Sequence, residues 1–231
     1  MKTISTPVNR TSFYLGLLFF ATVLCLFSCK KDDVPGTNEV KGEAKVKMIN
    51  ASNKSGQVDF YLDDTKINMA ALDAGQVSDY VKVQSGVKNT YVAIDGVADT
   101  PTSFNFVPTL SYTSFYVEDK TGNGEVLTFE DNLGATEAGK AKIRIINLGA
   151  FFTNALNVNL AGGVLLVNSL PFKGASGYFS IEPNVNLNIS VLGSSANKTI
   201  PGSEFEAGKI YTIWINGTSN ATLKINKVIY N

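Results

Sequence analysis

The sequence contains no histidine, which removes the commonest general base and the commonest metal ligand of proteins. Its only two cysteines, Cys25 and Cys29, lie within the first 29 residues. The rest of the chain can therefore form no disulfide, and buried apolar side chains must stabilise its fold. With 44% hydrophobic residues in a chain of 231, the composition is sufficient for a core.

Arginine is also scarce, since Arg144 is the only one after residue 28. Residues 1–28 hold two of the 20 basic residues and none of the 20 acidic ones, so the remainder carries two more acidic than basic side chains. Proteins that bind nucleic acid need clustered Lys and Arg to neutralise phosphates. We therefore expect no nucleic-acid partner.

The N-terminal segment has the three parts of a signal peptide. Lys2 and Arg10 precede an apolar run over residues 13–27, and small residues follow at its end. As a helix, this run would rise about 22 Å, which is short of the roughly 30 Å hydrocarbon core of a bilayer. The pattern predicts a cleaved signal peptide over residues 1–28. A true membrane span and a plain secretory signal remain as alternatives.

The end of this segment resembles the lipobox of bacterial lipoproteins. Leu26 lies three places before Cys29, and the small Ser28 directly precedes it. Cys25 fits less well, because Thr22 stands where leucine is expected. The resemblance implies cleavage before Cys29, a diacylglycerol thioether on its sulfur and a fatty acyl amide on its nitrogen. Each buried methylene contributes about 0.8 kcal/mol, so several acyl chains would hold the protein durably on a membrane.

Residues 29–43 are polar and contain Pro35 and two glycines, which predicts a lipidated flexible tether. The Lys30–Asp33 string, Lys-Lys-Asp-Asp, resembles the short tag that sends some Gram-negative lipoproteins to the outer face of the outer membrane. We therefore expect an outer-membrane, lipid-anchored protein that faces the cell surface. The alternative is a solvated charge run beside the lipid headgroups.

After the tether, the chain repeats itself with an offset of 97 to 99 residues, which indicates a duplication. Four segments return in the same order: 44–50 as 141–147, 58–62 as 156–160, 78–83 as 176–181, and 112–115 as 211–214. The domains expected from this repeat cover residues 44–134 and 135–231.

The repeated segments alternate polar and apolar residues, as strands with one buried face do. This alternation places Val46 and Met48 on one face of the first repeat, and Ile143 and Ile145 on one face of the second. Glycine- and asparagine-rich turns separate the segments, and no helical periodicity follows the signal peptide. We predict an all-β protein with two tandem antiparallel β-sandwich domains of immunoglobulin or transthyretin type.

The repeated motifs resemble a domain of unknown function that occurs singly or in tandem in exported bacterial proteins. The similarity lies in the opening strand that ends in Ile-Asn, in Val58–Asp64, in a Tyr-Val strand, and above all in Ala207–Thr212. The first copy departs from the last of these motifs, since it has Pro108–Thr113 there. The resemblance covers nearly all of residues 44–231. It implies an exported all-β module and supplies no catalytic residue.

One weak metal candidate is a calcium loop formed by Asp119, Asn123 and Glu130. Its oxygen donors stand at alternate positions, a glycine follows, and a carboxylate closes the loop. The favoured interpretation of the same segment is a hairpin turn, with Asn123 and Gly124 both tolerating positive φ. We expect neither a bound metal nor a cofactor.

The candidate ligand contact is the aromatic pair Phe151 and Phe152, which lies in the loop after the first strand of the second repeat. An aromatic pair on an exposed loop can contact an extracellular glycan or protein. The alternatives are that the pair caps the sandwich or forms the joint between the domains. The turn at residues 119–125 is the second candidate.

Taken together, these patterns predict a non-catalytic, surface-exposed lipoprotein that acts as a binding, adhesion or scaffolding module. Its expected partners are the membrane, through the lipid on Cys29, and an extracellular glycan or protein. A structural subunit of a surface fibre or of an outer-membrane complex is the alternative. A hydrolase ranks third, because no motif supports one.

Overall fold

The computed structural model describes residues 41–230, which fall within the compact unit Glu39–Asn231. The predicted signal peptide, the cleavage positions Leu26 and Ser28, and the lipidation site Cys29 lie outside the described residues. Within the described part, no helix is long and apolar enough to cross a membrane. The first strand begins at Glu43, so the last residue of the predicted tether already belongs to a sheet.

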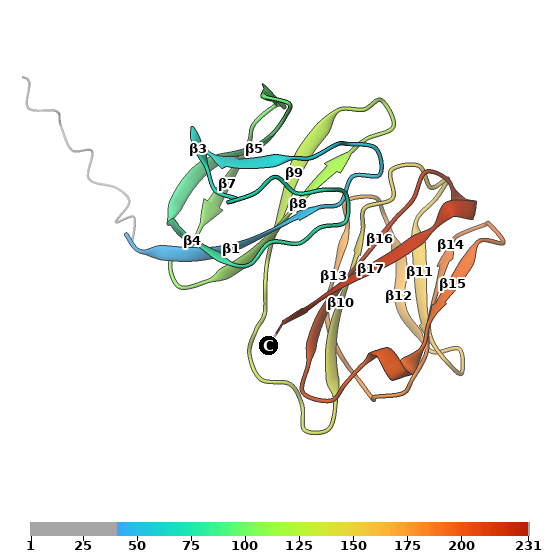
Figure 1. Cartoon of the computed structure of the whole chain (residues 1–231). Helices are drawn as coiled ribbons and strands as arrows, with labels where there is room; N and C mark the ends of the chain where they lie inside the picture. The colour runs from blue at the N-terminus through green and yellow to red at the C-terminus, as the bar shows by residue number, and fades with distance from the viewer. Residues whose placement is uncertain (1–40, 231) are drawn as a thin grey trace, which may run out of the picture. The chain divides into compact units, whose positions relative to one another are not determined.

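The first half of the fold consists of two packed sheets (Figure 1). One has the strand order β4-β1-β8-β9, and the other has the order β3-β2-β5-β6 with β7 also paired to β5. The strands are β1 (Glu43–Asn50), β2 (Asp59–Leu62), β3 (Thr65–Lys66), β4 (Val81–Gln84), β5 (Gly86–Ile94), β6 (Val97–Ala98), β7 (Thr102–Phe106), β8 (Ser111–Glu118) and β9 (Gly124–Glu130).

The second half repeats this plan. Its sheets have the orders β13-β10-β16-β17 and β12-β11-β14-β15. The strands are β10 (Ala141–Asn147), β11 (Leu156–Leu160), β12 (Leu165–Leu170), β13 (Ala175–Ile181), β14 (Leu187–Val191), β15 (Asn197–Ile200), β16 (Ile210–Asn216) and β17 (Lys224–Tyr230), with two short 3-10 turns at Gly202–Glu204 and Asn220–Thr222.

The all-β sandwich predicted from the alternation is therefore confirmed. The repeated segments fall on strands with equivalent places in the two halves, because β1, β4 and β8 occupy the positions that β10, β13 and β16 occupy. One detail differs from the prediction of purely antiparallel sheets. The β1–β8 and β10–β16 pairs are parallel, so each of these sheets is mixed.

Three apolar clusters hold four sheets together in layers. The first sandwich encloses Val46 and Met48, and the second encloses Ile143 and Ile145, as the alternation predicted. A third cluster joins the two sandwiches through the opposite faces of the sheets that contain β1 and β10. Those two sheets are called the inner sheets below. The central strands β8, β10 and β16 are buried on both faces, and every residue of β10 and β16 is buried, whereas β1 begins with one face exposed.

Candidate functional site

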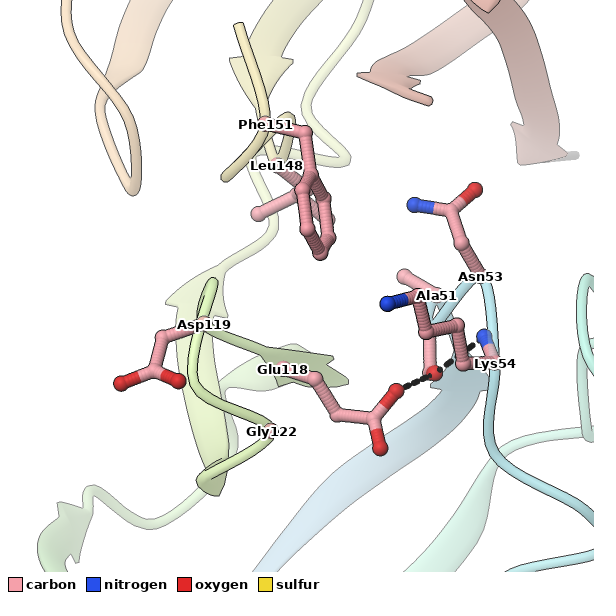
Figure 2. A pocket seen from close by; sticks show the side chains of 9 residues that line it. Ala51, Asn53, Lys54, Glu118, Asp119, Gly122, Leu148 and Phe151 are labelled. Carbon is pink, nitrogen blue, oxygen red and sulfur yellow. Dashed lines mark hydrogen bonds between the residues drawn. The ribbon is translucent and has the colours of Figure 1, made fainter. Parts of the chain in front are cut away.

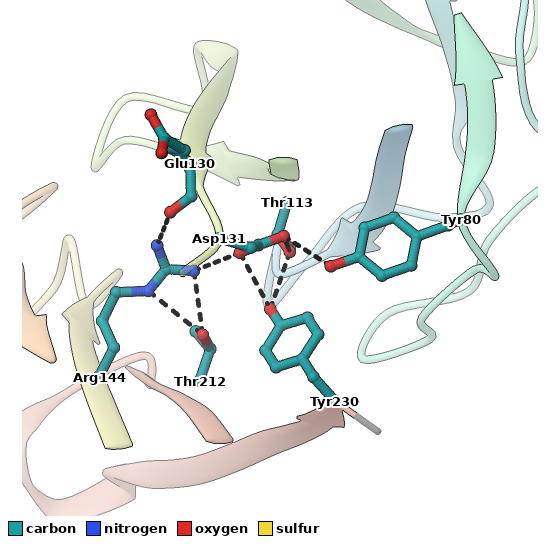
Figure 3. Close-up of polar contacts among 7 residues, drawn as sticks. All are labelled: Tyr80, Thr113, Glu130, Asp131, Arg144, Thr212 and Tyr230. Carbon is teal, nitrogen blue, oxygen red and sulfur yellow. Dashed lines mark hydrogen bonds and ion pairs between the residues drawn. The ribbon is translucent and has the colours of Figure 1, made fainter. Parts of the chain in front are cut away.

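A buried ion pair joins the two halves at the inner sheets (Figure 3). Asp131 directly follows β9, and Arg144 lies in β10. The Nη2 atom of Arg144 donates to Oδ1 of Asp131 at 2.7 Å, with the two side chains only 4% and 0% exposed. The guanidinium also donates to the carbonyl oxygen of Glu130 and to the hydroxyl of Thr212. The only arginine after residue 28 thus holds the end of one half against the start of the other.

Hydroxyl groups from three further segments complete this cluster around Asp131. Thr113 in β8 donates to Oδ2 at 2.7 Å, and Tyr80 before β4 donates to the same atom at 2.8 Å. The Tyr230 hydroxyl, from the last strand, lies 2.8 Å from that of Thr113 and 3.3 Å from Oδ1. Burial raises the pKa of Asp131, whereas Arg144 and the two hydroxyl donors act in the opposite direction. We call these residues, with Thr212, the clasp.

Aromatic side chains surround the clasp and fill the rest of the junction. The rings of Phe115 and Trp214 meet edge to face, with centroids 5.7 Å apart. The Arg144 guanidinium lies over the ring of Tyr178, 4.9 Å from its centroid. Two domains of one chain move relative to each other unless their interface is large and hydrophobic. The apolar cluster and the buried ion pair together therefore oppose relative motion of the two sandwiches.

Loops from both halves meet at one end of the junction and enclose a small cavity (Figure 2). Its volume is about 30 Å³, which is room for one or two waters rather than for a ligand. The β1–β2 loop, the β8–β9 turn and the β10–β11 loop line it through Ala51, Ser52, Asn53, Lys54, Glu118, Asp119, Gly122, Leu148 and Phe151. We call this surface the loop end.

Direct contacts fix the loop end across the two halves. The Nζ atom of Lys54 lies 4.7 Å from the centroid of the Phe151 ring. Asn53 donates to the carbonyl oxygen of Gly217 at 3.3 Å, and Asn216 donates to that of Ala51 at 2.9 Å. The loops of the two sandwiches therefore form one surface rather than two separate ones.

The structure separates the predicted aromatic pair. Phe151 is half-buried and borders the cavity, as a contact residue would. Phe152 is only 5% exposed and packs in the core of the second sandwich. The prediction that Phe152 contacts a ligand is therefore wrong. Its ring lies against Gly149, where any Cβ would overlap it, so this glycine makes the inward packing feasible.

The hairpin interpretation of the β8–β9 turn is confirmed, because Glu118 pairs with Gly124 and the strands stay in register to Glu130. The left-handed residue is Gly122, with φ of 91°, rather than Asn123 or Gly124. Gly124 has another role, since a Cβ there would overlap the Tyr116 hydroxyl and its acceptor Asp99.

The calcium arrangement of Asp119, Asn123 and Glu130 is not formed. The whole of β9 separates Glu130, which pairs with Tyr112, from the turn. Oδ1 of Asp119 accepts bonds from the backbone of Thr121 at 2.8 Å and of Asn123 at 3.0 Å. The Thr121 hydroxyl also donates to this oxygen, at 2.7 Å. The hydroxyl bond is the largest cause that lowers the pKa of Asp119 to about 2, and the two backbone bonds add to it. Among the described residues, no group of three acidic side chains is placed to hold a metal.

A larger hollow in the first sandwich lies elsewhere, between β2, β3, β4 and β5. It has a volume of about 250 Å³, and its walls include the apolar Leu62, Ile67 and Val83. At its rim, Lys88 Nζ lies 3.0 Å from a carboxylate oxygen of Asp63, so these two charges compensate each other. Nothing in this rim selects a ligand class, and the loop end remains the candidate site.

Comparison of the sequence with known families assigns the chain to one of them. Residues 44–161 match the family described as a domain of unknown function, DUF4397. This match covers just over half of the chain, so the protein belongs to that family. The matched stretch runs from β1 into β11, past the boundary predicted at residue 134. No curated protein matches the chain.

Sequence reasoning missed the clasp. The signal was present, because Arg144 is the single arginine after residue 28 and stands between two isoleucines in a largely apolar strand. Alternation alone places such a side chain on a solvated face. Only the burial of that face against a second sandwich makes the arginine a structural residue.

Proposed function

We propose that this protein is a non-catalytic lipoprotein of the outer membrane, anchored through Cys29 and facing the cell surface. It acts as a binding, adhesion or scaffolding module, and the loop end contacts an extracellular glycan or protein. The main support for the proposal is that loops from both sandwiches form one surface. There, Nζ of Lys54 lies 4.7 Å from the centroid of the Phe151 ring. Rigid strands that present loops are the usual arrangement for binding in such folds.

The anchor has a direct test with a matched control in the chain. Cys29→Ser should move the protein from the detergent phase to the aqueous phase of a detergent partition, whereas Cys25→Ser should leave it in the detergent phase. Mass spectrometry of the N-terminal peptide should show acyl chains on Cys29. A native protein that begins at another residue, or that partitions into water, would remove the basis for this location.

Surface exposure is tested by adding protease to intact cells. We expect the folded part to be released or degraded without cell lysis, while a periplasmic control protein stays intact. A chain that is cleaved only after the outer membrane is permeabilised would place its partners in the periplasm.

Contact at the loop end is tested with a photo-crosslinking amino acid at position 151 of the full chain. Val164 is a matched control, because it is exposed in the β11–β12 hairpin and lies outside the loop end. Irradiation of cells in contact with a host or neighbouring surface should give a discrete product from position 151 and none from position 164. Equal products from both positions, or none from 151, would count against binding at this end.

Two observations weigh against the alternative of a fibre built by strand exchange. The terminal strand β17 pairs with β16 over its whole length, and its Tyr230 is held in the clasp. A fibre subunit that releases a strand by cleavage at arginine would need an accessible arginine, and Arg144, the single one after residue 28, is buried. We therefore expect a single band in unheated denaturing gels of the native protein, whereas a fibre subunit would give a ladder.

A further inference from the structure

An aromatic pair lies on the outer face of the first sandwich, away from the loop end. Tyr61 in β2 and Tyr91 in β5 are directly opposite each other in the antiparallel ladder. Their rings are stacked, with centroids 5.0 Å apart and planes 4° from parallel. The neighbouring residues Phe60 and Val92 point into the core, so the two tyrosines point to solvent.

This pair differs from the other aromatic pairs of the described residues, each of which includes at least one buried ring or belongs to a core cluster. Neither Tyr61 nor Tyr91 belongs to any of the three apolar clusters. Both side chains are only half-buried. A cross-strand aromatic pair contributes about 0.5–1.5 kcal/mol beyond its area, so a purely stabilising role is the competing explanation.

An ion pair between Lys66 and Asp59 and a polar side chain lie beside the two tyrosine rings. Lys66 is opposite Tyr61 in the ladder with β3, and its Nζ lies 2.8 Å from Oδ1 of Asp59. Asn89, two residues before Tyr91 on the same face, is exposed. The face therefore offers aromatic rings, hydrogen-bond donors and acceptors, the paired charges of Asp59 and Lys66, and the exposed carboxylate of Asp64 beside Tyr91.

The carboxylate of Asp59 is held in place by the buried Asn68. Asn68 is 5% exposed, and its side-chain amide donates to Oδ1 of Asp59 at 3.0 Å and to the carbonyl oxygen of Ala70 at 2.8 Å. Its own oxygen accepts from the backbone of Phe60 at 2.7 Å. A carboxylate that is fixed before binding loses little conformational entropy when a ligand arrives.

We propose that this face, formed by Tyr61, Tyr91, Asp59 and Lys66, is a binding site for a neutral pyranose chain. The C–H faces of a sugar ring pack on aromatic rings, and its hydroxyl groups exchange hydrogen bonds with a fixed carboxylate and ammonium group. The cation of Lys66 is paired with Asp59, and the exposed Asp64 adds a negative charge beside Tyr91, so this face does not attract a polyanion, which favours an uncharged glycan. The site is independent of the loop end.

The test is native gel electrophoresis of the full-length protein in non-ionic detergent, with laminarin, mannan or hydroxyethylcellulose in the gel. At least one of these neutral polysaccharides should retard the protein, and added salt should not abolish the retardation. Tyr61→Ala and Tyr91→Ala should each raise the apparent Kd about tenfold or more. Tyr61→Phe and Tyr91→Phe retain the ring faces and should weaken binding far less than the alanine variants. Val164→Ala lies outside both surfaces and should bind like the parent, and Phe151→Ala tests whether the loop end takes part instead.

A second measurement needs no variant and so does not depend on the folding of the alanine proteins. Nitration of the native protein, followed by mass spectrometry, should modify Tyr61 and Tyr91, and saturating polysaccharide should lower their modification about tenfold. Absence of retardation by all three polysaccharides would overturn the site. So would unchanged nitration in a bound complex, or equal retardation of parent and alanine variants. Loss of retardation in Phe151→Ala alone would move the glycan to the loop end.

Discussion

Two sets of contacts join the halves of this molecule, and they differ in their exposure to water. The clasp places the carboxylate of Asp131 against Arg144 with both side chains almost fully buried. At the loop end, Lys54 lies against a half-buried Phe151 and remains exposed. A buried charge that loses its partner is far more costly than an exposed one. The clasp therefore fixes the junction, whereas the loop end leaves its side chains partly exposed to solvent.

The largest effect is expected from breaking the clasp. Arg144→Ala would leave the Asp131 carboxylate buried without its cation, and we expect a loss of about 3–5 kcal/mol in the free energy of unfolding. Urea denaturation followed by the fluorescence of Trp214, which lies in the same junction, measures this loss.

The matched control for that experiment replaces both partners. Arg144→Met combined with Asp131→Leu removes both charges. It should recover part of the lost stability because no charge is left buried alone, although the hydroxyls of Thr113 and Tyr80 lose their acceptor. A single variant as stable as the parent, or a double variant as unstable as Arg144→Ala, would show that the clasp is not the main support of the junction.

The neighbouring phenylalanines give the next largest contrast. Phe152→Ala should cost about 3–5 kcal/mol, because it leaves a cavity in the core of the second sandwich. Phe151→Ala removes a half-buried ring and should cost less than about 1 kcal/mol. Thermal and urea unfolding of the two variants, measured together, compare them. Equal losses would mean that both rings support the fold and that Phe151 is not available to a partner.

A smaller effect is expected from Lys54→Ala at the loop end. An exposed cation over an aromatic ring contributes about 0.5–1 kcal/mol, so the unfolding free energy should fall by no more than this. Lys54→Arg keeps the cation and serves as the control. A loss near that of Arg144→Ala would contradict the distinction between the two regions.

The smallest effect concerns the β8–β9 turn and its pH dependence. The turn lowers the pKa of Asp119 to about 2, so its stabilising contribution is present above the ordinary carboxyl pKa and is lost as pH falls through about 2. A carbon-detected NMR titration should report this pKa, and Thr121→Ala should raise it because the hydroxyl donor is removed. A carboxyl that titrates near 4 in the parent would contradict the bonding described.

Much of the fold was predictable, because both repeats obey the same rule. The alternation of polar and apolar residues is a local property of each strand. It predicted that Val46 and Ile143 lie inside their sandwiches, and both are found there. The parallel pairing of β1 with β8 was not predictable in this way, since alternation is the same in parallel and antiparallel strands. The turn at residues 119–125 was located, although Gly122 rather than Asn123 or Gly124 takes the positive φ.

The junction was the part that the sequence could not specify. Lys142 and Arg144 occupy the polar positions of β10, and a polar position is identical in sequence whether water or a second sheet covers it. The directions of the Phe151 and Phe152 rings were likewise not predictable from the sequence. Consecutive residues in a loop point in different directions, and only the packing at Gly149 decides which of the two rings turns inward.

Because Arg144 is buried, its cleavage by a protease can be used to follow opening of the fold. An arginine-specific endoprotease finds one target after residue 28, and β10 hides that target while the sandwiches remain docked. Cleavage would divide the chain close to the boundary between its halves and yield two fragments of similar size. Because β10 also pairs with β13 and β16, the rate at which these fragments accumulate would report how often this strand leaves its sheet, without any label or engineered site.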